Sequence, residues 1–177
     1  MQRVLIIATD GFEQSELMKP REILMEAGAE ITIASLKAGE IRGWDQNNWG
    51  DSITVDKTIG DVSAEDYDAL LLPGGQINPD VLRMDSKVID IIRAFDAAAK
   101  PIAAICHAPW LLAEAHLVEG RTVTSWPSIR TDLANAGAAV VDREVAIDGN
   151  LITSRKPDDI PAFTEALMAA LNMELVS

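Results

Sequence analysis

The spacing of apolar and polar residues predicts strands that alternate with helices along the chain. Short, continuous apolar runs at residues 4–8, 69–72 and 102–105 are typical of strands buried on both faces. Helical periodicity marks residues 15–27 and 86–99, which end at Gly28 and before Pro101, and a further strand is predicted at 30–36. The alternation predicts an α/β fold with a mostly parallel sheet and helices on both faces.

The remaining segments are shorter or less regular. Residues 39–56 are polar and rich in turn formers, which predicts a β-excursion with a long loop. A helical turn is predicted at 64–67, helices at 107–115, 127–136 and 157–171, and strands at 122–125, 139–141, 144–147 and 151–154. Asp148-Gly149 suits a hairpin turn. Because no repeat or linker interrupts the pattern, we expect a single domain over residues 1–177.

The position of loops relative to the predicted strands indicates where a site would form. Doubly wound sheets bind their ligands at the carboxyl ends of the strands. Three predicted loops lie there: residues 9–16, residues 73–76, and the pair Cys106-His107. We therefore expect the functional side chains to lie in these loops.

The chain's single cysteine, Cys106, lies between the predicted strand at 102–105 and a predicted helix. A sharp strand-to-helix turn exposes the side chain at its apex, as in the nucleophile elbow of hydrolases. Free N–H groups and partial positive charge at the helix start favour the thiolate, so we expect a pKa below the usual ~8.5. A lone cysteine beside an apolar strand is often a small buried hydrophobe, but this placement favours a reactive thiolate.

Backbone donors and a histidine flank Cys106 in the predicted site. Gly74 and Gly75 follow a core strand, and the Gly75 N–H is a candidate for an oxyanion hole. Adjacent side chains on a helix do not face each other, so we expect His107 to line the pocket without close contact with the sulfur. Its N–H is a second candidate donor, and a histidine without chemistry is the alternative.

Two acids and two tryptophans complete the candidates. Glu13 and Glu16 lie where a carboxylic acid can hydrogen-bond the sulfur, although for Glu13 we favour a helix N-terminal acid that interacts with the helix dipole. Trp126 follows a strand end and is a candidate wall of the pocket, whereas Trp110 is expected in the core.

Charge and composition exclude several classes of partner. The chain has 15 basic and 28 acidic residues, a net charge of −13, and this surface repels nucleic-acid phosphates and anionic lipids. No apolar run approaches the ~20 residues of a membrane span. A single cysteine suits a reducing, cytoplasmic setting. Two histidines and one cysteine without ligand spacing predict no metal, and we expect no other cofactor.

Taken together, the motifs resemble the PfpI/ThiJ superfamily, specifically its PfpI-like branch. The resemblance spans nearly the whole chain and implies a flavodoxin-like three-layer sandwich, related to class I glutamine amidotransferase domains. The segments that carry it are Phe12-Glu13, Glu16-Leu17 and Pro20; Leu72-Pro73-Gly74-Gly75; Ala104-Ile105-Cys106-His107-Ala108-Pro109; Thr124-Ser125-Trp126-Pro127; and Asp148-Gly149-Asn150 through Ser154-Arg155.

The resemblance assigns roles to individual residues. It implies that Cys106 is the nucleophile, that Glu16 is the acid that hydrogen-bonds it, that His107 is the histidine following the cysteine, and that Gly75 is the backbone donor. Asp80 lies near the position where proteolytic members supply a glutamate from a neighbouring subunit to orient the histidine.

Three departures from the family pattern bear on the activity. Asp80 is shorter than the glutamate it replaces, Ala108 stands where the family usually has glycine, and Trp126 stands where PfpI has tyrosine. These departures weaken the peptidase hypothesis more than one involving a small molecule.

The resemblance implies three alternative functions. The first is a cysteine-dependent, cofactor-free enzyme for small reactive carbonyls, either a glyoxalase converting methylglyoxal to lactate or a deglycase of glycated amines and thiols, with a role in stress protection. The second is an intracellular cysteine peptidase or amidase, and the third is a non-enzymatic redox sensor or chaperone, since an accessible thiolate oxidises readily. A homodimer or higher homo-oligomer is also expected.

Overall fold

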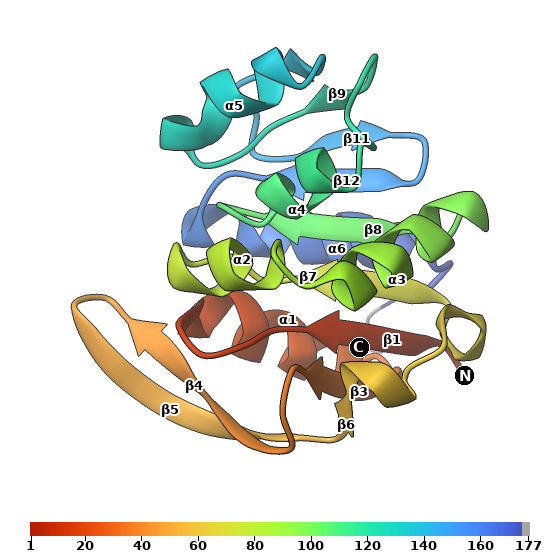
Figure 1. Cartoon of the computed structure of the whole chain (residues 1–177). Coiled ribbons are helices and arrows are strands. Elements are labelled where there is room, and N and C mark those ends of the chain that lie inside the picture. Colours follow the sequence, from red (N-terminus) through yellow and green to blue (C-terminus); the bar gives the residue numbers. More distant parts are fainter. Residues whose placement is uncertain (175–177) are drawn as a thin grey trace.

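In the computed structural model, which describes residues 1–174, a seven-stranded sheet crosses the middle of the molecule (Figure 1). The strand order is β11-β12-β8-β7-β1-β3-β6, and all neighbours are parallel except β11 and β12. The strands are β1 (Arg3–Ile7), β3 (Glu30–Ser35), β6 (Lys57–Thr58), β7 (Ala69–Leu72), β8 (Ile102–Ile105), β11 (Ala146–Asp148) and β12 (Leu151–Ser154). The prediction of a mostly parallel α/β sheet is confirmed. Residues 175–177 of the predicted domain lie outside the described residues.

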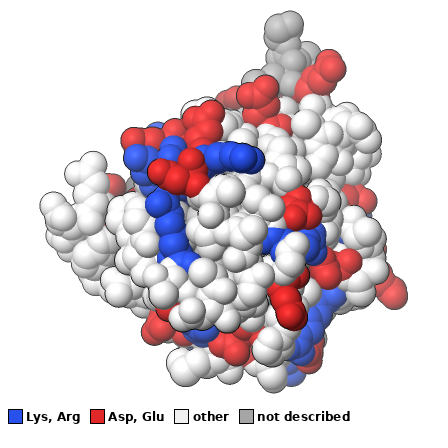
Figure 2. Space-filling view, turned by 90° about the horizontal axis from the view of Figure 1, so that it is seen from above, with Lys and Arg blue, Asp and Glu red and all other residues white. Residues whose placement is uncertain are grey.

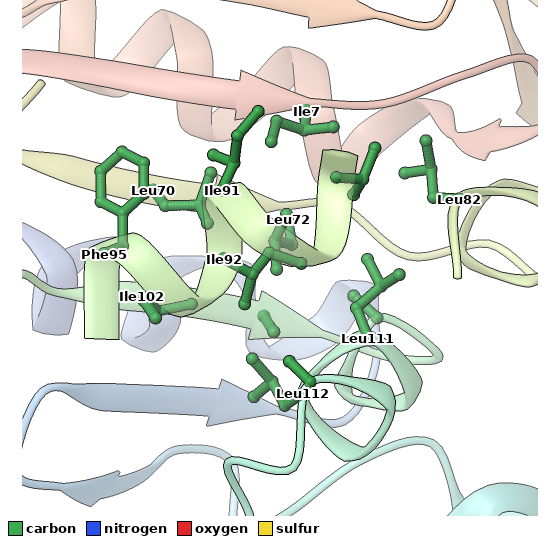
Figure 3. Packing of buried hydrophobic residues seen from close by; sticks show 14 of the residues in the cluster. Ile7, Leu70, Leu72, Leu82, Ile91, Ile92, Phe95, Ile102, Leu111 and Leu112 are labelled. Atoms are coloured by element: carbon green, nitrogen blue, oxygen red, sulfur yellow. The ribbon is translucent and has the colours of Figure 1, made fainter. Parts of the chain in front are cut away.

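Helices cover both faces of this sheet, which makes three layers. One face packs against α1 (Gln14–Glu26) and α6 (Ile160–Ala170), and the other against α3 (Ser86–Ala97) and α4 (Pro109–Glu114). Alternate strand residues point to opposite faces: Leu70 and Leu72 pack with α3 and α4 (Figure 3), whereas Leu71 belongs to the cluster on the other face. The continuous apolar runs are therefore strands covered on both sides, and the predicted sandwich is confirmed.

A second sheet projects beside the first. It contains β2 (Phe12–Glu13), β4 (Gly39–Asp45) and β5 (Asn48–Val55), with β4 and β5 forming a long hairpin (Figure 1). The long loop predicted within residues 39–56 is wrong, because only Gln46 and Asn47 separate the two strands. Both strands are largely exposed, so their sequence lacks the apolar run of a core strand. Trp44 and Trp49 meet edge to face across the hairpin, with centroids 5.3 Å apart.

Several predicted bounds need correction. The helix predicted at 107–115 begins only at Pro109, and the helix predicted at 127–136 is a 3-10 turn (Pro127–Ile129) followed by α5 (Arg130–Asn135). The segments 122–125 and 139–141 contribute a two-residue parallel pair, β9 (Thr122–Val123) and β10 (Ala139–Val140). The predicted hairpin turn is confirmed, because Asp148 pairs with Leu151 in the antiparallel β11–β12 ladder.

One helix escaped prediction altogether. The six-residue α2 (Ile77–Leu82) follows the loop after β7. Its shortness leaves no room for helical periodicity, and Pro79 lies within it. This omission matters, because α2 holds the loop that carries Gly74 and Gly75.

The surface carries both signs of charge. Figure 2, seen from above Figure 1, shows Lys and Arg side chains lying among Asp and Glu side chains on that face. Within residues 1–174, no helix combines the length and apolar character needed to cross a bilayer.

Candidate active site

The parallel strands bring three loops to one edge of the main sheet. Gly74 and Gly75 follow β7, Cys106 follows β8, and the chain after β1 leads through β2 into α1, which carries Glu16. Because β7 lies between β1 and β8, these segments are neighbours in space although they are distant in sequence. The structure therefore brings the predicted candidates together at the carboxyl ends of the strands.

Cys106 occupies a sharp turn between β8 and α4. Its φ is +66°, a left-handed conformation that costs a non-glycine residue about 1 kcal/mol or more. Two hydrogen bonds hold the turn: the Cys106 N–H donates to Ser154 O at 3.0 Å, and its carbonyl accepts from the Trp126 N–H at 2.9 Å. Cys106 is only 6 % exposed. The strained turn predicted from the strand–cysteine–helix order is present, but the expectation that it exposes the side chain is wrong, because Cys106 packs within the buried cluster on the α1 and α6 face of the sheet.

Two backbone N–H groups lie near the sulfur. The N–H groups of Gly75 and His107 both oppose the rise in the pKa of the Cys106 thiol. Gly75 has a φ of +85°, and a Cβ there would lie 2.5 Å from the carbonyl oxygen of Gly11, so no larger residue fits. These are the two donors expected for an oxyanion hole, and they lie where negative charge on sulfur or on a bound substrate would be stabilised.

Glu16 is fully buried beside the thiol. Its Oε1 accepts from the Gly74 N–H at 3.0 Å. Its Oε2 is buried without a hydrogen-bond partner in the described part of the chain. The carboxyl and Cys106 lie on either side of Gly74, because a Cβ at Gly74 would be 2.6 Å from both Glu16 Oε1 and the Cys106 Cβ. A buried carboxyl oxygen with spare capacity next to a thiol is suited to proton transfer.

Glu13 caps the helix that carries Glu16. Its carboxylate accepts from the Glu16 N–H at 3.2 Å and from the Ser15 hydroxyl, as an N-cap residue does. The interpretation of Glu13 as a helix N-terminal acid is confirmed by these contacts. The cap fixes the first turn of α1 and so the direction in which Glu16 projects.

Burial controls the ionisation of both reactive groups. Desolvation raises the pKa of Glu16 well above its usual value, the charge of Glu13 raises it further, and the Gly74 N–H opposes this. Desolvation, and then the charge of Glu16, raise the pKa of the Cys106 thiol, and the N–H groups of Gly75 and His107 oppose the rise. The expectation of a lowered thiol pKa is wrong for the protein without substrate. Burial outweighs the partial positive charge at the start of α4, because this helix begins three residues after Cys106 and is only six residues long.

His107 contacts the sulfur directly, contrary to expectation. Its Nδ1 lies 3.2 Å from the Cys106 sulfur. The expectation assumed that both residues belong to a helix, but Cys106 is left-handed and α4 begins only at Pro109. Burial lowers the pKa of His107, so the ring is neutral at neutral pH, and in the tautomer with its proton on Nε2 the Nδ1 atom can accept a proton.

Two tryptophans orient the His107 ring. Trp126 stacks on it, with centroids 5.9 Å apart and an interplanar angle of 23°, and Trp110 meets it edge to face at 5.1 Å. Trp126 is 37 % exposed, so it borders the site as predicted. Trp110 is only half-buried, and its indole N–H donates to Asp132 at 2.9 Å, so its assignment to the core is only partly right.

Asp80 lies on the exposed side of α2. Within residues 1–174, it makes no hydrogen bond or ion pair with His107. Its contribution to a neighbouring subunit stays a prediction. No group of three or more His, Cys, Asp or Glu side chains in the described chain is arranged to hold a metal ion.

Two buried polar groups near the site are not among the residues predicted from the sequence. Asn78 in α2 is fully buried and hydrogen-bonds the loops after β1 and β7. Asp159 is 1 % exposed, and its carboxylate accepts two hydrogen bonds from the Arg155 guanidinium, one at 2.9 Å and one at 3.0 Å. The charge of Asp159 also raises the pKa of Glu16. Asn78 lies in the six-residue α2 and Asp159 in a three-residue 3-10 turn, and segments this short show no periodicity that distinguishes a buried side chain from an exposed one.

Comparisons with known proteins agree on one family. Residues 2–170 match the profile of the DJ-1/PfpI family. The chain is 43 % identical over 171 residues to General stress protein 18 of Bacillus subtilis, covering 96 % of this chain and 98 % of that protein. It is 40 % identical over 172 residues to Protein/nucleic acid deglycase 2 of Escherichia coli, with the same coverage of each chain.

Two further similarities concern the activity and the fold. The protein named Putative cysteine protease YraA of Bacillus subtilis is 42 % identical over 163 residues, which cover 92 % of this chain and 94 % of YraA. The crystal structure of Drosophila melanogaster DJ-1beta superimposes with a TM-score of 0.85 at 32 % identity, over 96 % of this chain and 90 % of that one.

Proposed function

The chain belongs to the DJ-1/PfpI family, and from that premise we propose that it is a cysteine-dependent, cofactor-free enzyme acting on small reactive carbonyls. The reaction is the conversion of methylglyoxal to lactate, or the release of such a carbonyl from early adducts of amines and thiols. Relatives named as deglycases and a general stress protein support this class of substrate. We place the enzyme in the cytoplasm, as a homo-oligomer.

One observation carries the proposal. The Cys106 sulfur lies 3.2 Å from a neutral imidazole, near the Gly75 and His107 N–H groups that oppose the rise in its pKa, and beside a buried carboxyl with an oxygen that has no hydrogen-bond partner within residues 1–174. A nucleophile, two candidate proton carriers and an oxyanion hole therefore meet at one point. This arrangement is complete for adding sulfur to a carbonyl.

The first step forms a hemithioacetal. The sulfur attacks the aldehyde carbon, a C–S bond forms, and the thiol proton passes to Nδ1 of His107 or to Oε2 of Glu16. The carbonyl oxygen becomes an alkoxide, which the Gly75 and His107 N–H groups stabilise before it takes up a proton. The raised pKa of the thiol is compatible with this step, because the thiol need not ionise beforehand: its proton leaves as the C–S bond forms.

The second step moves a proton along the substrate. The same carrier removes the proton from the carbon bonded to sulfur and returns it to the neighbouring carbonyl carbon, through an enediol, which leaves a 2-hydroxy thioester. Water then attacks the thioester, the C–S bond breaks, and lactate and the free thiol result. One methylglyoxal and one water give one lactic acid, so no oxidant or reductant is needed.

The test follows methylglyoxal loss and lactate formation together, without glutathione and in the presence of a metal chelator. Wild type, Cys106→Ser and Glu16→Gln are compared, with Glu165→Gln as the matched control because Glu165 is exposed on α6. Lactate from wild type and the control, with little from the two site variants, is the expected result. Methylglyoxal loss without lactate would show stoichiometric adduct formation and would contradict the proposal.

The 3.2 Å contact between Cys106 and His107 favours a second candidate, a cysteine peptidase or amidase. Such an enzyme uses histidine as the general base and needs a third group to orient it. Here Trp126 and Trp110 contact the ring, and a carboxylate would have to come from Asp80 of another subunit. Cleavage of amide reporters that Asp80→Asn abolishes, by an oligomeric protein, would favour this alternative.

A redox sensor or chaperone is the third candidate. It predicts a mass gain at Cys106 under peroxide and no turnover of any carbonyl or amide. The carbonyl and amide assays above therefore separate all three functions.

A further inference from the structure

Asn78 joins two of the three loops that form the site, those after β1 and β7. Its side chain is fully buried. Oδ1 accepts from the Thr9 N–H at 2.8 Å, and Nδ2 donates to the carbonyls of Pro73 at 3.0 Å and Gly74 at 3.1 Å. One partner is a donor and the other two are acceptors, so only one orientation of the amide satisfies all three. The side chain uses both ends of its amide to hold the backbone beside Cys106.

These bonds determine which way the Gly74–Gly75 peptide faces. In a trans peptide the C=O and the following N–H point in opposite directions. The Gly74 carbonyl accepts from Asn78 Nδ2 and also from the Glu13 N–H at 3.2 Å, on the side away from the sulfur. The Gly75 N–H therefore faces the opposite side, toward Cys106, and it opposes the rise in the pKa of that thiol.

The backbone alone does not favour this orientation. Gly75 has a φ of +85°, and turning the peptide by half a turn would bring φ to about −95°, which is open to any residue. Two successive glycines offer little resistance to such a rotation. The rotated peptide would present the Gly74 carbonyl to the sulfur, replacing a donor with an acceptor. Something outside the loop must therefore hold the observed orientation.

We propose that Asn78 is a positioning residue that holds the Gly74–Gly75 peptide with its N–H toward Cys106, so that the site presents a donor to the anion formed there. Asn78 does not touch the reacting atoms and acts through Gly75. The inference rests on the proposed role of Cys106 as the nucleophile. The strand, the turn at Cys106 and the two glycines do not by themselves fix the orientation of this peptide, and Asn78 does.

The test measures thiol reactivity, which needs no turnover. We compare the rate of Cys106 alkylation by iodoacetamide at pH 8, read by mass spectrometry, in wild type, Asn78→Leu and Asn78→Ser. Leucine has a similar shape without hydrogen bonds or charge, and serine keeps one donor. Loss of one N–H donor to the thiolate is expected to slow alkylation about tenfold in Asn78→Leu, with Asn78→Ser intermediate. If Asn78→Leu does not fold, the serine variant still decides the question.

Asn150 supplies the matched control at the opposite edge of the sheet. Its amide also makes three hydrogen bonds, to Asp96 Oδ1 at 3.1 Å, to Lys100 O at 3.0 Å and from Arg121 at 3.0 Å. Asn150→Leu should lower the melting temperature and leave the alkylation rate unchanged. The inference is overturned if the Asn78 variants lose stability like Asn150→Leu but alkylate at the wild-type rate or faster.

A second readout comes from turnover. In an active enzyme, Asn78→Leu should lower kcat at least tenfold with little change in KM, because the donor matters most when charge develops. An equal rise in KM with unchanged kcat would contradict the inference. If wild type turns over no carbonyl while the Asn78 variants still alkylate slowly, the proposed function fails and the positioning role stands.

Discussion

Gly74 separates the two groups on which the proposed chemistry depends, and replacing it with alanine is the sharpest perturbation that the site offers. A Cβ at Gly74 would lie 2.6 Å from three atoms: the Cys106 Cβ, Glu16 Oε1 and the carbonyl oxygen of Ile105. The φ of Gly74 is not in the positive range, so the backbone itself tolerates alanine. The effect of Gly74→Ala is therefore steric and falls on the Cys106–Glu16 pair.

The size of the effect follows from these contacts. Ordinary contacts of a Cβ begin near 3.4 Å, so each of the three atoms would have to retreat by about 0.8 Å. Overpacking of this kind costs about 1–3 kcal/mol, and we expect about 3 kcal/mol because the Ile105 carbonyl is backbone and Cys106 is already strained. For a chain of this length, that loss corresponds to a fall in melting temperature of about 6–12 °C.

The assay combines thermal unfolding with lactate formation, and Gly60→Ala is the matched control. Gly60 also has no positive φ, and its added Cβ would meet only the Lys87 ammonium nitrogen, at 3.6 Å. We expect Gly60→Ala to keep full activity and to leave the melting temperature unchanged or slightly higher. A Gly74→Ala protein with wild-type melting temperature and wild-type lactate formation would refute the reasoning.

Three further predictions concern buried ionisable groups. Burial raises the pKa of Glu16, so the folded state loses stability as the pH rises from the usual value of 4.5 toward the raised pKa. Glu16→Gln should therefore be more stable than wild type at pH 7, and denaturant titrations should show no such gain at pH 4. Because burial lowers the pKa of His107, the unfolded chain binds a proton near pH 6.5 that the folded chain does not. The free energy of unfolding should therefore fall between pH 7.5 and pH 5, and it should fall less in His107→Asn. Equal losses in both proteins would count against a buried neutral ring. Asp159→Asn should lower the free energy of unfolding by about 3 kcal/mol in the same titrations, because it leaves Arg155 without its main partner. The control is Asp158→Asn, which removes an exposed 4.0 Å pair with Lys156 and should change the free energy of unfolding by under about 0.5 kcal/mol.

The pattern of the chain was sufficient for much of the fold. Residues 69–72, 102–105 and 151–154 are strands with the predicted bounds, because a strand covered on both faces needs a continuous apolar run that few other structures need. The exposed β4–β5 hairpin and the six-residue α2 could not be predicted in this way. The side chains of the hairpin mostly face solvent, and α2 is too short to show a helical period, so burial leaves no regular apolar pattern in either sequence.

The location of the site followed from the sequence, and its internal arrangement did not. The order strand, Cys106, helix and the two glycines after β7 indicated the edge of the sheet where Cys106, Glu16 and Gly75 meet. The close approach of His107 depended on the left-handed turn at Cys106, which is held by a hydrogen bond to the Ser154 carbonyl and one from the Trp126 N–H.

The tertiary structure alone decided the ionisation of the site and the support of its loops. Desolvation raises the pKa of Cys106 and Glu16, and desolvation is a sum over neighbours that come from β1, β7, β8 and α1. Asn78 and Asp159 are polar residues whose burial follows from packing against distant segments. A sequence pattern reports the period with which a segment meets the core, whereas the strength of a charge or a hydrogen bond depends on which groups the fold places around it.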